Sequence, residues 1–172
     1  MSLTVFRHGA IHNHLIAEDP GLSEVGAKAV TKRSLELLSL GVPVGMIVTS
    51  QLRRAIETSN IFSAVYPDAS SYSSPVLNPS DQTSSLQDEV RSWVDVCRDG
   101  LLLIGHDPIV SQFVLDICGV SVEGREHWYI PTGSGVVLQP SNTPSGEHYN
   151  PVHYLGHTRA LPITMASSAP SI

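Results

Sequence analysis

The sequence predicts an α/β protein, a three-layer α/β/α sandwich whose mostly parallel central sheet is covered by helices on both faces. Short apolar runs at residues 3–6, 44–49 and 101–104 have the composition of strands that are buried on both faces. Each run is followed, after a polar stretch, by a segment with helical spacing. Strands that alternate with helices in this way are typical of parallel sheets with crossover connections.

The first strand, expected over residues 3–6, ends at Arg7, His8 and Gly9. Ligands of open parallel sheets lie just beyond the carboxyl ends of the strands. At such an edge Arg7 has the planar fork that binds phosphate oxygens, and a neutral His8 nitrogen can attack phosphorus. Taken alone, these three residues fit a solvated strand end equally well, because short motifs carry a real false-positive risk.

The first helix is expected from Ser23, its candidate cap, to about Leu40. Gly41 and Pro43 end it, since glycine and proline rarely continue a helix. Residues 44–49 then form the second expected strand, which is rich in β-branched and apolar residues.

The second helix is expected from Ser50, a plausible cap, to about Tyr66, with Arg53 and Arg54 in its first turn. The first turn of a helix offers unpaired N–H groups and the positive end of the helix dipole. A strand that leads into such a helix start predicts a phosphate-binding arrangement.

A Ser- and Pro-rich stretch after the second helix predicts a loop with a short strand at residues 74–77. A helix with one apolar face is expected over residues 86–97. The third apolar strand, residues 101–104, ends near His106, and a helix over residues 109–118 follows it. A second histidine is thus expected at the carboxyl edge of the sheet.

The last part of the chain predicts an antiparallel edge to the sheet. An edge strand is expected at residues 136–138, a hairpin-like loop at 140–150 and a return strand at 152–155. We expect one domain over residues 1–158. Residues 159–172 are rich in Pro, Ser and Ala and are expected to form a flexible tail.

Three successive strand–helix units therefore place basic residues at the end of a strand or the start of its helix. Side by side in a parallel sheet, these ends would gather Arg7, His8, Arg54 and His106 around one point. Such a group suits a dianionic phosphoryl group, because arginines neutralise its oxygens while a histidine attacks in line.

The motifs occur in order as Arg7-His8-Gly9, as Ser50-Gln51-Leu52-Arg53-Arg54-Ala55 followed by Thr58, and as Gly105-His106-Asp107-Pro108. Together they resemble the histidine phosphatase superfamily, which has the phosphoglycerate mutase-like fold. Within it, the short chain and the segments at 77–81 and 131–136 resemble the small SixA-type phosphohistidine phosphatases.

The resemblance implies a phosphatase that works through a covalent intermediate. His8 would be the nucleophile and become phosphohistidine, while Arg7, Arg54 and His106 would bind the phosphoryl oxygens. Water would then hydrolyse the intermediate. The resemblance implies neither a metal nor an organic cofactor. The substrate would be phosphohistidine of a protein or a small phosphomonoester.

The general acid is less defined than the nucleophile. Asp81 is the first candidate by its place in the segment at 77–81, with Asp107 and Glu89 as alternatives. An aspartate in such a loop fits a turn residue equally well. His14 is expected to contact substrate near the pocket mouth, and Ser134 to offer a backbone N–H to phosphate.

Composition limits the possible partners. A net charge of −6 without a block of Lys and Arg argues against nucleic acid. Cys97 and Cys118 are too few for a disulfide scaffold, and with no apolar run of ~20 residues for a membrane helix we expect a cytoplasmic protein. His12 and His14 suggest a metal site, but no carboxylate or cysteine cluster completes it and Arg7 would repel a cation.

Two other functions stay open. A phosphoglycerate mutase-type phosphotransferase would need a longer substrate-binding insertion than this chain offers. A catalytically silent phosphate-binding module on the same fold need not keep a nucleophile. The expected partner is a phosphorylated protein or a small phosphorylated metabolite, and the chain is expected to be a monomer or a dimer.

Overall fold

The computed structural model describes residues 1–12, 18–79, 82–97, 99–121, 123, 125, 127–141 and 148–162. Its strands are β1 (Leu3–Arg7), β2 (Met46–Thr49), β3 (Ser70–Ser73), β4 (Leu101–Gly105), β5 (Gly135–Pro140) and β6 (Tyr149–Leu155). Its helices are α1 (Glu24–Ser39), α2 (Arg53–Val65), α3 (Ser84–Val96) and α4 (Ile109–Ile117), with a 3₁₀ turn at Pro75–Leu77. Within these ranges no helix has the length and apolar character needed to cross a membrane.

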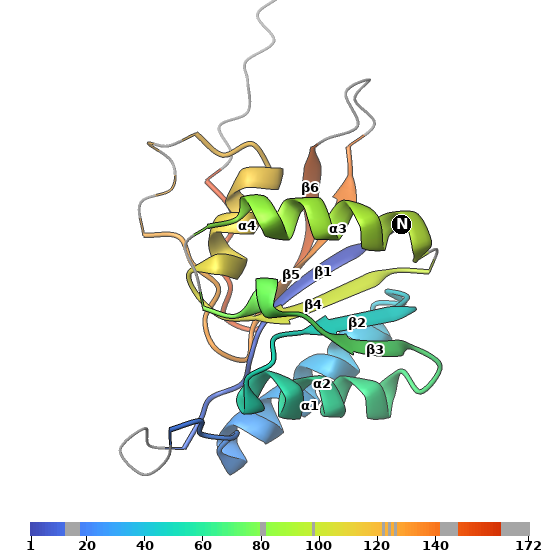
Figure 1. The fold of residues 1–172 in the computed structure, drawn as a ribbon, viewed down its shortest axis with the longest axis vertical. Helices are drawn as coiled ribbons and strands as arrows, with labels where there is room; N and C mark the ends of the chain where they lie inside the picture. The colour runs from blue at the N-terminus through green and yellow to red at the C-terminus, as the bar shows by residue number, and fades with distance from the viewer. Residues whose placement is uncertain are drawn as a thin grey trace, which may run out of the picture.

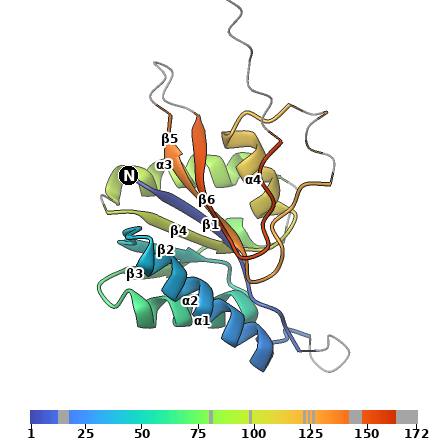
Figure 2. The same cartoon turned by 180° about the vertical axis from the view of Figure 1, so that it is seen from behind.

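The six strands form one sheet in the order β3-β2-β4-β1-β5-β6. The pairs β3–β2, β2–β4 and β4–β1 are parallel, whereas β5 pairs antiparallel with β1 and with β6. Helices α1 and α2 cover one face, and α3 and α4 cover the other (Figures 1 and 2). The predicted α/β sandwich, mostly parallel with an antiparallel edge, is confirmed.

Strand β4 explains why the apolar runs are continuous. Leu101 and Leu103 pack in the core under α3 and α4, while Leu102 and Ile104 pack in the core over α1 and α2. Successive side chains of a strand point to opposite faces, so a strand between two helical layers needs apolar residues at every position.

The starts of α1 and α2 differ. Ser23 caps α1 as predicted, since its hydroxyl accepts a hydrogen bond from the Gly26 N–H at 3.0 Å. Ser50 is not the cap of α2, because that helix begins at Arg53 after Leu52 and has no cap from Leu52 itself. Instead the Asp19 carboxylate accepts the Arg53 N–H at 2.9 Å, while the Ser50 hydroxyl accepts the Leu52 N–H at 3.2 Å, just before the helix.

The strand predicted at residues 74–77 is wrong. Pro75 begins a 3₁₀ turn, which suits a residue without an N–H, and the strand is the preceding segment β3. All four residues of β3 are exposed and three are serines, so no hydrophobic alternation marks it. The backbone pairing with β2 is what identifies this segment as a strand.

Part of the predicted tail is packed. The Arg159 carbonyl accepts a hydrogen bond from the Trp128 indole at 3.0 Å, and the Leu161 N–H donates to the Tyr154 hydroxyl at 2.9 Å. Leu161 is only 8% exposed and belongs to the core under α4. The packed chain therefore continues past residue 158, while residues 163–172 lie outside the described part.

Candidate active site

The carboxyl ends of β2, β4 and β1 lie side by side in the sheet, as the prediction of one basic cluster requires. A cavity of about 330 Å³ opens there. It is lined by Arg7, His8, Ile11, Arg54, Pro79, His106, Asp107 and Thr132. The four basic residues that the motifs single out therefore share one cavity.

His8 is held so that one of its ring nitrogens is unprotonated. The side chain is 6% exposed, and its Nδ1 lies 2.7 Å from the Gly9 carbonyl oxygen. Since a carbonyl only accepts, Nδ1 carries the proton and Nε2 is the unprotonated nitrogen. The pKa of His8 is lowered to about 4, mainly by burial and also by the Arg54 and Arg7 cations, while the Gly9 hydrogen bond acts in the opposite direction. His8 is thus a neutral imidazole at neutral pH.

The turn after His8 is fastened to α2 by Thr58. The Thr58 hydroxyl accepts the Gly9 N–H at 3.1 Å and donates to the Arg54 carbonyl at 2.8 Å. Gly9 is also needed for space, because a Cβ there would lie 2.7 Å from a methyl group of Val30. Thr58 and Gly9 thereby set the position of His8 relative to Arg54.

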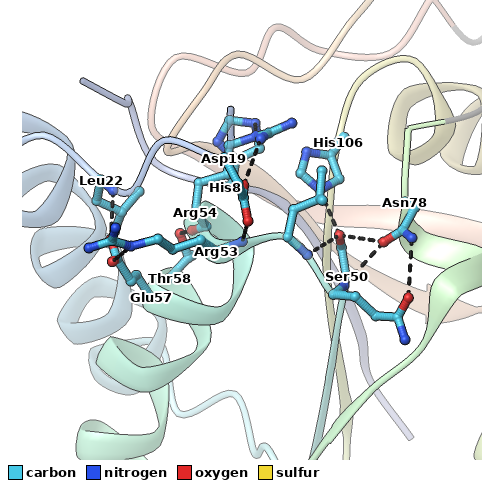
Figure 3. A network of polar contacts seen from close by, with 12 residues as sticks. His8, Asp19, Leu22, Ser50, Arg53, Arg54, Glu57, Thr58, Asn78 and His106 are labelled. Carbon is cyan, nitrogen blue, oxygen red and sulfur yellow. Dashed lines mark hydrogen bonds and ion pairs between the residues drawn. The ribbon is translucent and has the colours of Figure 1, made fainter. Parts of the chain in front are cut away.

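His106 is held through Nε2, whereas His8 is held through Nδ1. Its Nε2 lies 2.7 Å from the Ser50 hydroxyl, which donates to the Asn78 Oδ1 at 2.8 Å (Figure 3). Its Nδ1 is buried and has no partner among the described residues. The rings of His106 and His8 lie 4.8 Å apart. Burial lowers the pKa of His106 to about 3, with the electrostatic effects of His8, Arg54 and Arg7 in the same direction.

The two arginines keep donors for a ligand. Arg54 Nε donates to the His8 Nε2 at 3.3 Å, and its Nη1 lies 3.5 Å from the Asp19 carboxylate. Arg7 Nη1 donates to the Ile130 carbonyl at 3.0 Å. Burial lowers the pKa of Arg54, and Asp19 raises it again. The guanidinium groups supply the positive charge that a phosphoryl dianion requires.

Asp19 is a site residue that sequence reasoning missed. One of its oxygens faces Arg54 and the other accepts the first N–H of α2. The same loop is docked on α2 by Glu57, which accepts the Leu22 N–H at 2.6 Å and pairs with Arg53 (Figure 3). No motif surrounds Asp19, and the only available signal was its position after the first strand in a polar loop.

The remaining predicted residues are placed differently. Asp107 lines the cavity and accepts a hydrogen bond from Ser111. Ser134 is buried but does not line the cavity, because its N–H donates to the Pro131 carbonyl and its hydroxyl accepts the His157 N–H. The candidates Asp81 and His14 lie outside the described residues.

The alternative of a metal site near His12 and His14 finds no support within the described ranges. There, no group of three or more His, Cys, Asp or Glu side chains gathers in a way that could hold a metal ion. His14 itself is outside these ranges, and the absence of a metal from the reaction stays a prediction.

No family model and no curated protein matches the sequence. Solved structures do match the fold. The protein histidine phosphatase SixA, complexed with tungstate, is 17% identical with a TM-score of 0.74, over 90% of this chain and 96% of that one. The mycobacterial glucosyl-3-phosphoglycerate phosphatase is 13% identical with a TM-score of 0.68, over 92% and 99% of the two chains.

The alpha-ribazole phosphatase of Shigella flexneri is also similar, at 13% identity and a TM-score of 0.68 over 93% of this chain and 98% of that one. The class of protein is therefore an α/β sandwich of the phosphoglycerate mutase-like type. More particularly, the chain has the fold of the histidine phosphatases, which is the fold that the resemblance implies.

Proposed function

We propose that this chain is a histidine phosphatase, which hydrolyses a phosphoryl group through a phosphohistidine intermediate on His8. The observation that carries the proposal is the state of His8. Its Nδ1–H is committed to the Gly9 carbonyl, so its Nε2 is unprotonated, and this nitrogen accepts a hydrogen bond from Arg54 in a cavity shared with both arginines. The histidine phosphatase fold supports the same reaction.

In the first step the His8 Nε2 lone pair attacks phosphorus, and the bond from phosphorus to the leaving atom breaks. Arg7, Arg54 and His106 bind the phosphoryl oxygens, and the arginines stabilise the charge that builds up on them. The Gly9 carbonyl accepts from Nδ1–H and so stabilises the positive imidazole ring that forms. The leaving group departs with a proton.

In the second step water attacks the phosphohistidine, the bond from phosphorus to Nε2 breaks, and inorganic phosphate leaves a neutral His8. The group that protonates the leaving group in the first step accepts the proton of water in the second. Asp81 remains our predicted donor. Asp107, which lines the cavity, is the alternative carboxylate, and variants of each to asparagine would separate the two.

The proposed substrate is a phosphohistidine of a protein or a small phosphomonoester. A phosphohistidine needs less help from an acid, because imidazole is a better leaving group than an alkoxide. The similarity to SixA supports the first substrate class, and the similarity to the two sugar- and ribazole-phosphate enzymes supports the second.

The test is hydrolysis by the purified, metal-free protein of a phosphohistidine peptide and of p-nitrophenyl phosphate, measured side by side. We expect phosphate release from at least one of them, with the phosphohistidine peptide preferred. A preference for the ester would assign a general phosphatase. A folded protein that releases phosphate from neither would contradict the proposal.

A further inference from the structure

A chain of hydrogen bonds leads away from His106 to a residue of the segment at 77–81 for which the sequence predicts no role. His106 contacts Ser50, Ser50 contacts Asn78, and Asn78 lies at the end of the 3₁₀ turn Pro75–Leu77 (Figure 3). The Asn78 amide also accepts the Gln51 backbone N–H at 3.1 Å. Four groups from three segments of the chain thus meet behind the cavity.

The donors and acceptors of this chain determine where each proton lies. The Gln51 backbone N–H can only donate, so the atom of Asn78 that faces it is the oxygen. Ser50 must then donate its hydroxyl proton to that same oxygen, at 2.8 Å. Its remaining lone pairs accept, which leaves His106 Nε2, at 2.7 Å, as the donor.

We propose that Asn78 is a positioning residue which, through Ser50, holds His106 in the tautomer protonated on Nε2 and leaves Nδ1 as an unprotonated acceptor. His8 has the opposite tautomer, protonated on Nδ1. The buried Nδ1 of His106 has no hydrogen-bond partner among the described residues, so it is the one polar atom of this side chain left for a ligand.

The tautomer has a consequence that rests on the proposed function. A phosphoryl oxygen that reaches the His106 Nδ1 meets a lone pair. While Asn78 and Ser50 hold this tautomer, a hydrogen bond there forms only if the complex gains a proton. The charged groups around the ring are Arg7, Arg54 and Asp107, with His8 opposite it. Burial first, and then the nearby positive charges, keep the empty ring neutral, and a bound dianion offsets the arginines.

The direct test is the protonation of the ring nitrogens, measured by long-range ¹H–¹⁵N correlation on the full-length protein at pH 7.5 without ligand. His106 signals are assigned by their loss in His106→Asn. We expect an unprotonated Nδ1 and a protonated Nε2 for His106, and the reverse for His8. A His106 ring protonated on Nδ1 overturns the proposal.

Variants distinguish the effect of Asn78 on the His106 tautomer from that of its neighbour Gln51. Asn78→Leu frees the Ser50 hydroxyl to donate to His106, so the ring should become a mixture of both tautomers. Gln51→Ala is the matched control, since it removes only a 3.4 Å contact with the far side of Asn78 and keeps the backbone N–H. An unchanged ring in Asn78→Leu, or an equal change in Gln51→Ala, contradicts the assignment.

Asn78→Asp keeps the shape and the acceptor, so it covers the case in which Asn78→Leu fails to fold. Its carboxylate should keep the Nε2–H tautomer and raise the pKa of His106 by about one pH unit or more. An unchanged pKa would overturn the coupling through Ser50. None of these signals depends on turnover, so they remain decisive even if the protein hydrolyses nothing.

The proton that accompanies the ligand is measured by calorimetry with tungstate, a stable dianion at pH 8, in two buffers of different ionisation enthalpy. We expect uptake of about one proton per bound tungstate in the wild type and in Gln51→Ala. Asn78→Leu should take up less, because its ring already offers an N–H in part. Binding without proton uptake in the wild type would overturn the expected gain of a proton on ligand binding. The tautomer itself is tested separately by the ¹H–¹⁵N spectra.

Discussion

His8 and His106 follow neighbouring parallel strands and are both almost fully buried, yet they are held by opposite nitrogens. His8 donates through Nδ1 to a backbone carbonyl, which leaves the outer nitrogen Nε2 unprotonated. His106 uses that outer nitrogen on Ser50. The comparison teaches that the hydrogen-bond partner, more than burial or charge, decides which of two similar histidines can be the nucleophile.

The largest expected effect is the loss of activity on replacing His8, which should exceed the loss on replacing His106. His8→Ala should lower kcat/KM on the order of 10⁴-fold or more, because no nucleophile remains. His106→Asn should lower it by about 10²- to 10³-fold, as expected for the loss of one group that stabilises the transition state. Phosphate release measures both, with the exposed His153→Ala as control. Equal losses in the two variants would remove the distinction between them.

Arg54→Lys should lower kcat/KM by about 10²-fold, because lysine cannot contact His8 and a phosphoryl oxygen with one planar group. Arg53→Lys is a matched control from the same turn, since the Arg53 side chain is exposed and pairs with Glu57. Steady-state kinetics of both variants measure the difference. Wild-type kinetics in Arg54→Lys would take Arg54 out of the site.

Acidic pH should lower the stability of the folded protein, because both histidines have lowered pKa values in the folded state. The pKa of folded His8 is about 4 and that of His106 about 3, against 6.5 in the unfolded chain. The unfolded chain therefore binds more protons as the pH falls from 6.5 towards 4. The free energy of unfolding is therefore highest above pH 6.5. Below pH 6.5 it falls by about 1.4 kcal/mol per pH unit for each histidine.

Urea unfolding between pH 7.5 and 4.5 measures this loss. The acid limb of kcat/KM should likewise fall near pH 4, where His8 becomes protonated, and not near 6.5. His106→Asn should make the dependence of stability on pH shallower, whereas His153→Ala should leave it unchanged. A steep dependence that survives in His8→Asn and His106→Asn together would assign it to other groups.

Thr58→Val tests how the turn after His8 is held. Valine keeps the shape but leaves the Gly9 N–H without an acceptor in a buried place, which should cost about 1–3 kcal/mol of stability. The phosphorylation step should also slow, because His8 is no longer fixed relative to Arg54. Urea unfolding and single-turnover kinetics measure the two effects. Thr31→Val on the exposed face of α1 is the control, and an equal cost there would contradict the role of Thr58.

The smallest expected effect is that of Asp19→Asn. Asp19 competes with a ligand for Arg54, but its side chain is 44% exposed and the pair is screened by water. Tungstate should therefore bind about two- to fivefold more tightly. Calorimetry measures this, with the exposed Asp88→Asn as control. Weaker binding would show that Asp19 instead orients Arg54.

The sheet and the basic cluster could be predicted because their signals are local. A strand such as β4, which is covered on both faces, must be apolar throughout, and the change to Gly105 and His106 marks its end. Three such changes in order identify the edge where the cavity lies. The motifs then name Arg7, His8 and Arg54 without any knowledge of contacts.

The rest of the site could not be predicted because its contacts join distant parts of the chain. Asn78 reaches Ser50 across 28 positions and Asp19 reaches Arg54 across 35. No motif contains Asp19, and the segment at 77–81, which contains Asn78, indicated Asp81 instead. Strand β3 is polar because it lies at an exposed edge, so periodicity does not reveal it. Leu161 packs in the core although its neighbours have the composition of a tail.

The most direct test of the central claim is rapid quenching of the wild-type protein with ³²P-labelled phosphohistidine peptide or with a labelled phosphomonoester. We expect a transient label that is lost in acid, stable in base, and located on the peptide that contains His8. The label should be absent from His8→Ala. Hydrolysis that proceeds without this label, or with the label on another residue, would contradict the account.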